Sequence, residues 1–156
     1  MSELSPTAWE WNRGPIGRLL KIAYLAMRKE LEVMTRQAGM TSTQWSALGV
    51  LYHYPGLTNA DLEHFLHIER PSVTSLINGM EARGWVERKD HPKDARSKQL
   101  FLTPEGRALA RDTRHFAEAV EEKMLGRFSP DEIAALRVLL EKIIKSAAPP
   151  FIPKDE

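Results

Sequence analysis

The sequence predicts a mainly α-helical fold with one small β-hairpin and with long helices near both ends of the chain. Apolar residues recur at helical spacing along most of the chain. Two short apolar runs, 85–86 and 100–102, flank a polar, turn-rich stretch and predict the hairpin. Proline and glycine stand at the expected beginnings and ends of several helices.

Length and composition limit the classes of protein to which the chain can belong. With 156 residues, it is long enough for one small domain that carries additional helices. The absence of cysteine excludes disulfides, zinc–thiolate sites and thiol redox sensing. No apolar run approaches the roughly 20 residues that cross a bilayer, and residues 1–12 lack the pattern of a signal peptide. We therefore expect a cytoplasmic protein without a membrane partner.

The N-terminal half of the sequence predicts three helices of decreasing length. The first covers about 15–37 and is followed by a glycine. The second begins at Thr41, which forms a capping-box pattern with Gln44, and ends before Pro55. The third begins at Thr58 and is short.

A fourth helix and two later helices surround the predicted hairpin. The fourth helix runs from Pro71 to Arg83. After the hairpin, Thr103 caps a fifth helix, whose apolar stripe includes Leu109, Phe116, Val120 and Met124. Ser129 begins the last helix, with Ile133, Leu136, Leu140, Ile143 and Ile144 facing inward, and the proline-containing residues 149–156 predict an extended tail.

The terminal helices are too long for the small central core to cover them. A helix of about 24 residues extends about 36 Å. Burial of apolar surface is worth roughly 25 cal/mol per Å², so we expect a second copy of the chain to pack against the first and last helices. Packing on their own chain alone is the alternative.

The central elements follow the order of a winged helix-turn-helix: short helix, turn, second helix, β-hairpin. The helix 71–83 has an apolar inward stripe, and its opposite face carries small polar side chains. Hydroxyls and amides suit the base edges and phosphates of a major groove about 12 Å wide. An ordinary amphipathic helix with a polar outer face explains the same pattern, so this helix alone decides nothing.

The charge distribution strengthens the interpretation as a DNA-binding protein. Although the formal net charge is only +1, residues 70–99 hold seven Lys or Arg against four acids. Three of these cations surround one acid at the hairpin tip, 93–98. Such a tip suits a narrow minor groove, where the negative potential is enhanced, with Arg96 inserted and Asp94 orienting its guanidinium. A charged surface turn is the alternative.

The run from Glu69 to Glu105 resembles the MarR family of bacterial regulators. In that family a recognition helix is followed by a glycine with two apolar residues, a strand ending in Arg, a wing with Asp-x-Arg and a closing Leu-Thr. The sequence supplies Gly84-Trp85-Val86, Arg88, Asp94-Ala95-Arg96 and Leu102-Thr103 in register. The order of the helices and the helix start at Thr41 also match, so the resemblance extends over most of the chain.

The resemblance implies a helical homodimer that acts as a transcription regulator, commonly a repressor, on double-stranded DNA. The first and last helices would form the interface, and the recognition helices would enter major grooves about one helical turn apart on a pseudo-palindromic operator. The implied division is 1–40 as N-terminal arm and dimerisation helix, 41–103 as winged DNA-binding domain, 104–148 as C-terminal dimerisation helices and 149–156 as tail. The implied DNA contacts are Ser72, Thr74, Ser75 and Asn78 in the major groove, Arg96 in the minor groove with Asp94 positioning it, and Arg70 with Lys93 or Lys98 near phosphates.

Family members often release DNA when a small aromatic or anionic effector lodges between the dimer helices and the winged lobe. The candidate lining residues in this chain are Trp9, Trp11, Trp45, His115 and Phe116. Packing of the N-terminal arm is the alternative for the two early tryptophans, and a surface or interface position for His115. His64 and His67 have the spacing of a metal pair but lack an evident third ligand, so we expect no metal and no cofactor.

Two other classes of function remain to be compared. A winged helix can also bind another protein, because the fold does not determine the function, but such a module does not require a basic wing tip. No acid pair, Ser-His-Asp order or Gly-rich phosphate loop stands out, so we do not expect an enzyme. Salt-sensitive binding to duplex DNA separates the regulator from both.

Overall fold

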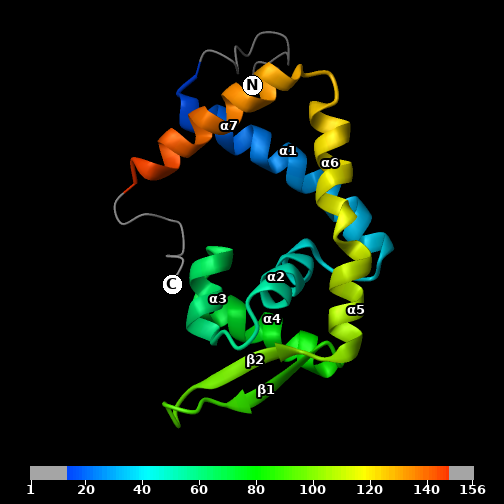
Figure 1. Ribbon diagram of the computed structural model, residues 1–156, viewed down its shortest axis with the longest axis vertical. Helices are drawn as coiled ribbons and strands as arrows, with labels where there is room; N and C mark the ends of the chain where they lie inside the picture. Colours follow the sequence, from blue (N-terminus) through cyan, green and yellow to red (C-terminus); the bar gives the residue numbers. More distant parts are fainter. Residues whose placement is uncertain (1–13, 148–156) are drawn as a thin grey trace, which may run out of the picture.

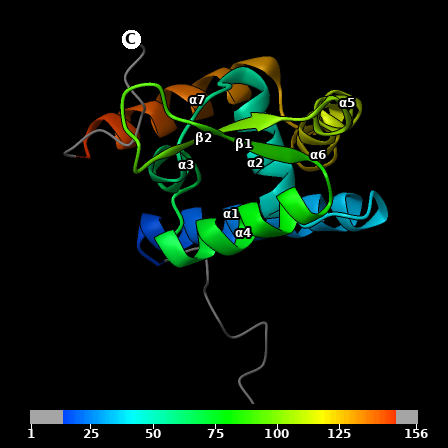
Figure 2. The same ribbon diagram turned by 90° about the horizontal axis from the view of Figure 1, so that it is seen from below.

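The computed structural model describes residues 14–147, which form a winged lobe and a helical end that are joined by α5 and α6 (Figure 1). In chain order the elements are α1 (Ile16–Gln37), α2 (Ser42–His53), α3 (Asn59–Leu66), α4 (Arg70–Ala82), β1 (Val86–Asp90), β2 (Lys98–Leu102), α5 (Pro104–Thr113), α6 (His115–Leu125) and α7 (Pro130–Lys145). Both α1 and α7 are at the end of the molecule opposite the hairpin (Figure 1), and Figure 2 shows them apart from each other.

The helix beginnings follow the capping pattern of the sequence. The Thr41 hydroxyl accepts a hydrogen bond from the Gln44 backbone N–H at 3.1 Å, and Gln44 Oε1 accepts one from the Thr41 N–H at 2.9 Å. The same reciprocal pattern begins α3 at Thr58 and α7 at Ser129. After α4, Gly84 adopts a φ of +75°, which favours glycine. These predicted boundaries are confirmed.

The hairpin strands are longer than the apolar runs predicted. Strand β1 pairs antiparallel with β2 from Val86↔Leu102 to Asp90↔Lys98, so the connecting loop covers only 91–97. One face of the hairpin is exposed, and backbone pairing there does not need apolar side chains. Leu100, on the inner face, is fully buried.

The predicted fifth helix is interrupted, which corrects the single helix expected from its apolar stripe. Helix α5 ends at Thr113 and α6 begins at His115. The Thr113 hydroxyl donates to the Leu109 carbonyl at 2.8 Å, a back-bond that bends helices. The indole Nε1 of Trp45 donates to the Thr113 carbonyl at 3.0 Å, so a side chain from α2 takes an acceptor at the interruption.

The hydrophobic core lies in the winged lobe. Its fully buried side chains come from α2, α3, α4 and β2, and they are Ala47, Leu48, Leu51, Leu62, Val73, Ile77, Met80 and Leu100. The predicted inward stripe of α4 is thereby confirmed, with Leu76 at the edge of the core. This packing holds the outer face of α4 beside the hairpin.

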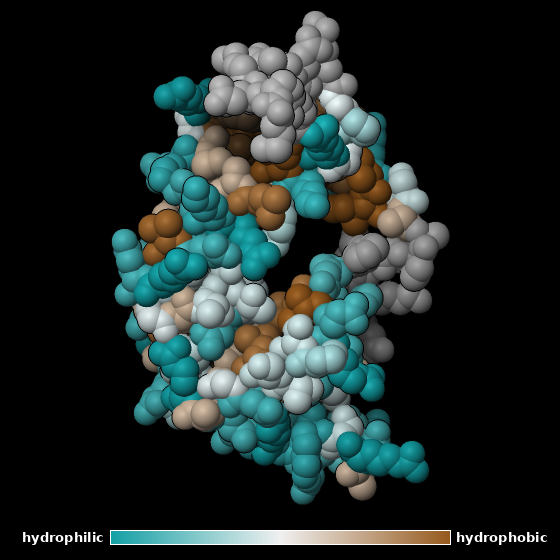
Figure 3. All heavy atoms as spheres, turned by 180° about the vertical axis from the view of Figure 1, so that it is seen from behind, coloured by the Kyte–Doolittle hydropathy of each residue, from teal (hydrophilic) through white to brown (hydrophobic). Residues whose placement is uncertain are grey.

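The helical end leaves much of its apolar surface uncovered in the single chain. Helix α7 has no buried residue, and its Val138 and Leu139 are 52% and 57% exposed. Ile143 and Ile144, which were predicted to face inward, are also exposed, because no element of the described chain covers that part of α7. On α1, Ile16, Tyr24 and Val33 are exposed as well. The space-filling view shows apolar side chains at the surface of this end and a hollow between it and the lobe (Figure 3).

Candidate nucleic-acid interface

Helix α4 and the hairpin lie side by side on the face of the lobe that points away from α1 and α7 (Figure 2). The side chains of Ser72, Thr74, Ser75 and Asn78 on this face are all exposed. The Thr74 hydroxyl donates to the Arg70 carbonyl at 3.2 Å within the helix. The structure therefore brings the predicted groove-facing residues together on one surface of short polar side chains.

One residue of this face is held by the neighbouring strand. Nη2 of Arg88, on β1, donates to Oδ1 of Asn78 at 2.7 Å. Nη1 of Arg88 lies 3.3 Å from Oε2 of Glu81, one turn further along α4. The sequence placed Arg88 in a family pattern but assigned it no contact, because only the tertiary structure shows how β1 lies against α4.

The wing loop positions Arg96 through its backbone. Oδ1 of Asp94 accepts a hydrogen bond from the Arg96 backbone N–H at 3.0 Å, and the Asp94 carbonyl accepts one from the Ser97 N–H at 3.1 Å. The carboxylate thus shapes the turn, whereas the sequence suggested a contact with the guanidinium. The Arg96 side chain is exposed and forms no ion pair with any residue between 14 and 147.

The other predicted phosphate contacts differ in their partners. Nε of Arg70 lies 3.4 Å from Oε2 of Glu63, and the ammonium of Lys98 pairs with Asp90. A hydrogen bond from Lys98, together with its charge, lowers the pKa of the Asp90 carboxyl. Lys93 is exposed at the loop, and its ammonium has no ion-pair partner in the described range.

A second arginine that sequence reasoning missed ties the end of α4 to the end of α1. Nη1 of Arg83 donates to the Gly39 carbonyl at 2.6 Å, and its guanidinium lies 3.8 Å from the centre of the Trp85 ring. Gly39 has a φ of +77°, as expected for the residue that follows a helix. The position of α4 is therefore linked to the end of α1.

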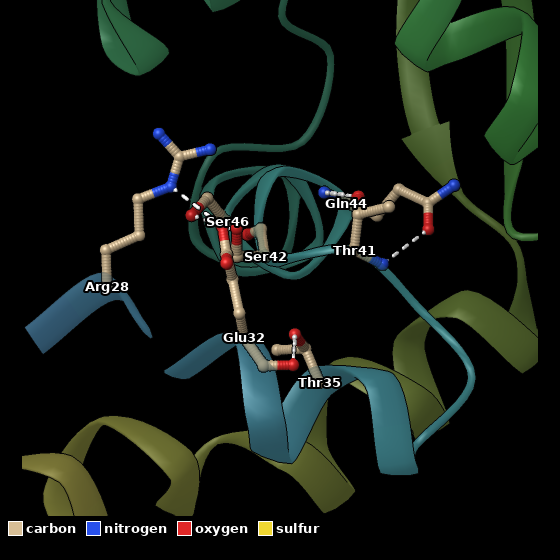
Figure 4. A network of polar contacts seen from close by, with 7 residues as sticks. All are labelled: Arg28, Glu32, Thr35, Thr41, Ser42, Gln44 and Ser46. Carbon is tan, nitrogen blue, oxygen red and sulfur yellow. Dashed lines mark hydrogen bonds and ion pairs between the residues drawn. The ribbon is translucent and has the colours of Figure 1, made fainter. Parts of the chain in front are cut away.

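A cavity of about 520 Å³ lies between α1, α2, α3 and α6. Its apolar lining includes Tyr24, Met27, Trp45, Phe65 and Val120, and its polar lining includes Arg28, Ser42 and Ser46. Nε of Arg28 lies 3.1 Å from Oε1 of Glu32. Figure 4 shows these two α1 side chains facing Ser42 and Ser46 on α2.

The predicted effector residues are only partly brought together. Trp45 lines the cavity, whereas His115 and Phe116 do not, and their rings contact each other at 4.9 Å between centroids. Trp9 and Trp11 lie outside the described residues. The rings of His64 and His67 are 6.4 Å apart, and no group of three or more metal-ligating side chains forms within 14–147.

Comparison with known proteins agrees with this geometry. The model of the MarR family matches residues 38–97, which include α2, α3, α4, β1 and the whole of the wing loop, 91–97. In these residues the chain is similar to the MarR family.

The known proteins that this chain resembles match it along most of their length. The multiple antibiotic resistance protein MarR of Salmonella typhimurium is 25% identical over 83% of this chain and 91% of its own. The transcriptional repressor Rv2887 of Mycobacterium tuberculosis is 26% identical over 83% and 93%. The structure of Bordetella bronchiseptica BpsR, described with the regulation of its DNA binding by 6-hydroxynicotinic acid, is 27% identical over 82% and 97%, with a TM-score of 0.75.

The structural match to BpsR shows that the two chains share this fold. Among the described helices, none is both long and apolar enough to span a membrane.

Proposed function

We propose that this chain is a dimeric transcription regulator, a repressor, that reads a pseudo-palindromic DNA operator. The observation that carries the proposal is the surface formed by the exposed polar face of α4 and the wing loop, where Arg96 and Lys93 lack ion pairs within the described chain. Two relatives support it, because Rv2887 is a transcriptional repressor and BpsR is a DNA-binding protein.

In the proposed complex, α4 enters the major groove and the wing reaches the adjacent minor groove. Ser72, Thr74, Ser75 and Asn78 face the bases, and Arg96 enters the minor groove. Lys93 lies near a phosphate without giving up an ion pair. Arg70 and Lys98 must first leave Glu63 and Asp90, and this exchange costs little, because exposed ion pairs are worth about 0–1 kcal/mol.

The proposed dimer uses the apolar surface of α1 and α7. Exposed side chains such as Tyr24, Val138 and Leu139 lose contact with water when a second copy packs on them. In this arrangement 1–40 and 104–148 form the dimer region, 41–103 binds DNA, and 149–156 is the tail. Two copies present two α4 helices, which matches a pseudo-palindrome.

The proposed effector is a small aromatic acid that binds in the cavity between α1 and α2. The aromatic and aliphatic lining suits a ring, and Arg28 uses only its Nε toward Glu32, which leaves its remaining N–H groups for a carboxylate. BpsR is regulated by 6-hydroxynicotinic acid, which belongs to this chemical class. Because the cavity lies between dimer helices and lobe helices, a ligand releases DNA if it binds one arrangement of the two better than the other.

Fluorescence anisotropy on a duplex from upstream of the protein's own gene tests the proposal. We expect binding that resists competitor DNA, with affinity falling by several decades per decade of salt. Addition of 6-hydroxynicotinic acid or p-aminosalicylic acid is expected to release the duplex. Absence of any duplex binding at low salt would contradict the regulator and favour a protein-binding winged helix.

A further inference from the structure

Asn78 is fixed on the outer face of α4 by a side chain from the hairpin. Nη2 of Arg88 donates to Oδ1 of Asn78 at 2.7 Å, while Nη1 of the same guanidinium lies 3.3 Å from Glu81 Oε2. Arg88 is only 28% exposed and is held between β1 and α4, whereas Asn78 is exposed. The amide is therefore anchored on its inner side and free on its outer side.

The chemistry of arginine determines which end of the amide faces outward. A guanidinium has N–H donors and no acceptor, so only the amide oxygen of Asn78 can face Arg88. The amide NH₂ group is then directed away from Arg88 and keeps its donors for another partner. The second lone pair of Oδ1 lies beside a cation, which disfavours the approach of a further amino group.

This orientation limits the bases that Asn78 can read. A free asparagine commonly pairs with adenine, because its oxygen accepts from N6 and its NH₂ donates to N7. With the oxygen engaged by Arg88, that pairing loses half of its contacts. Guanine presents two acceptors in the major groove, N7 and O6, and thymine presents O4, whereas cytosine presents an amino donor.

We propose that Asn78, oriented by Arg88, is a specificity-determining residue that selects guanine over adenine and disfavours cytosine. The inference rests on the proposed function, in which α4 enters the major groove. Arg88 is a positioning residue, since it acts through Asn78. One hydrogen bond within the protein, from Arg88 to Asn78, thus determines which base is preferred at the operator position that faces Asn78.

Selection of binding sites from a random-sequence duplex library tests this proposal on the full chain. The wild type is compared with Asn78→Ala, which identifies the operator position that depends on Asn78, and with Arg88→Leu, which frees the amide oxygen. Lys89→Leu is the matched control, because it removes one cation from the same strand while Asn78 keeps its partner. Asn78→Asp is a second variant that preserves the contact with Arg88 but removes the outward donors.

We expect the wild type to enrich guanine at the position where Asn78→Ala loses its preference. Arg88→Leu should shift the guanine-to-adenine ratio at that position by roughly tenfold or more toward adenine, within the range of one base contact. Lys89→Leu should lower affinity without this shift, and Asn78→Asp should abolish the guanine preference even if Arg88→Leu fails to fold.

Three results would overturn the inference while leaving the proposed function intact. The first is enrichment of adenine by the wild type at the operator position that depends on Asn78. The second is an equal loss of affinity for all sequences in Asn78→Ala, which would indicate that Asn78 contacts a phosphate. The third is an identical base preference in Arg88→Leu and Lys89→Leu. Failure of the wild type to enrich any sequence would instead remove the proposed function, and the inference with it.

Discussion

Replacement of Arg96 with alanine removes from each wing one guanidinium that has no ion-pair partner among residues 14–147, and is expected to flatten the salt dependence of DNA binding. Each phosphate neutralised contributes about 0.9 to the slope of log K against log salt. A dimer carries the substitution twice, so the slope should fall by about 1.8. Between about 50 and 200 mM salt, the affinity deficit of the variant relative to the wild type should therefore shrink roughly tenfold.

The fold should tolerate this substitution. Asp94 Oδ1 accepts from the Arg96 backbone N–H, and alanine retains that donor, so the turn keeps its hydrogen bond. The Arg96 side chain is exposed, and its removal creates no cavity. Dimerisation and the melting temperature should stay nearly unchanged.

The assay is fluorescence anisotropy across salt, with melting temperature and sedimentation measured on the same samples. Arg127→Ala is the matched control, because Arg127 is exposed in the α6–α7 connection, far from the hairpin. An unchanged slope in Arg96→Ala would refute the minor-groove role. A loss of stability that parallels the loss of binding would refute the claim that Arg96 acts on DNA alone.

Three further predictions concern the dimer, the packing and the wing. Leu139→Glu places a charge on the exposed apolar face of α7 and should shift the sedimentation coefficient toward that of the monomer. The helical circular dichroism signal should be retained. A dimer that persists in this variant would argue for another interface. Gly106→Ala should lower the free energy of unfolding, because the added Cβ collides with the backbone carbonyl that precedes β1. Gly49→Ala has open space around the added Cβ and should raise the free energy of unfolding by about 0.5–1 kcal/mol. Urea denaturation measures the sign of each change. The Asp90–Lys98 pair lowers the pKa of Asp90, so the stabilisation from this pair is present above the ordinary carboxyl pKa of 3.8 and is lost as pH falls through the lowered pKa. The difference in melting temperature between the wild type and Asp90→Asn should therefore narrow below pH 3.8. A difference that stays constant with pH would contradict the pairing.

Several features of the fold and the candidate site could be predicted from local sequence patterns. Capping boxes at Thr41, Thr58 and Ser129 begin helices through contacts that span only three residues. Helical periodicity predicts which apolar residues of α4 face inward, and the remaining polar residues of the helix must then face outward. The acidic and basic residues of the wing loop are contiguous in the chain, so their grouping needed no tertiary information.

Features that join distant segments could not be predicted in this way. The break between α5 and α6 coincides with a hydrogen bond from Trp45, which lies 68 residues before Thr113 and donates to its carbonyl. The single helix expected across this point follows from periodicity, which does not register a hydrogen bond from another helix. The strands extend beyond the apolar runs because pairing across the hairpin depends on backbone groups that every non-proline residue carries.

The sequence by itself determined the resemblance to the MarR family, the order of most of the helices and the polar surface of α4 with its basic wing, because each of these depends on residues close together in the chain. Only the tertiary structure decided how the side chains of that surface are used. It placed Arg88 against Asn78, left Arg96 without an ion pair within the described residues, and paired Lys98 with Asp90. It also opened the cavity between α1 and α2. The physical reason is that hydrogen bonds and ion pairs reach only a few ångströms, so their partners are set by how elements pack rather than by residue type.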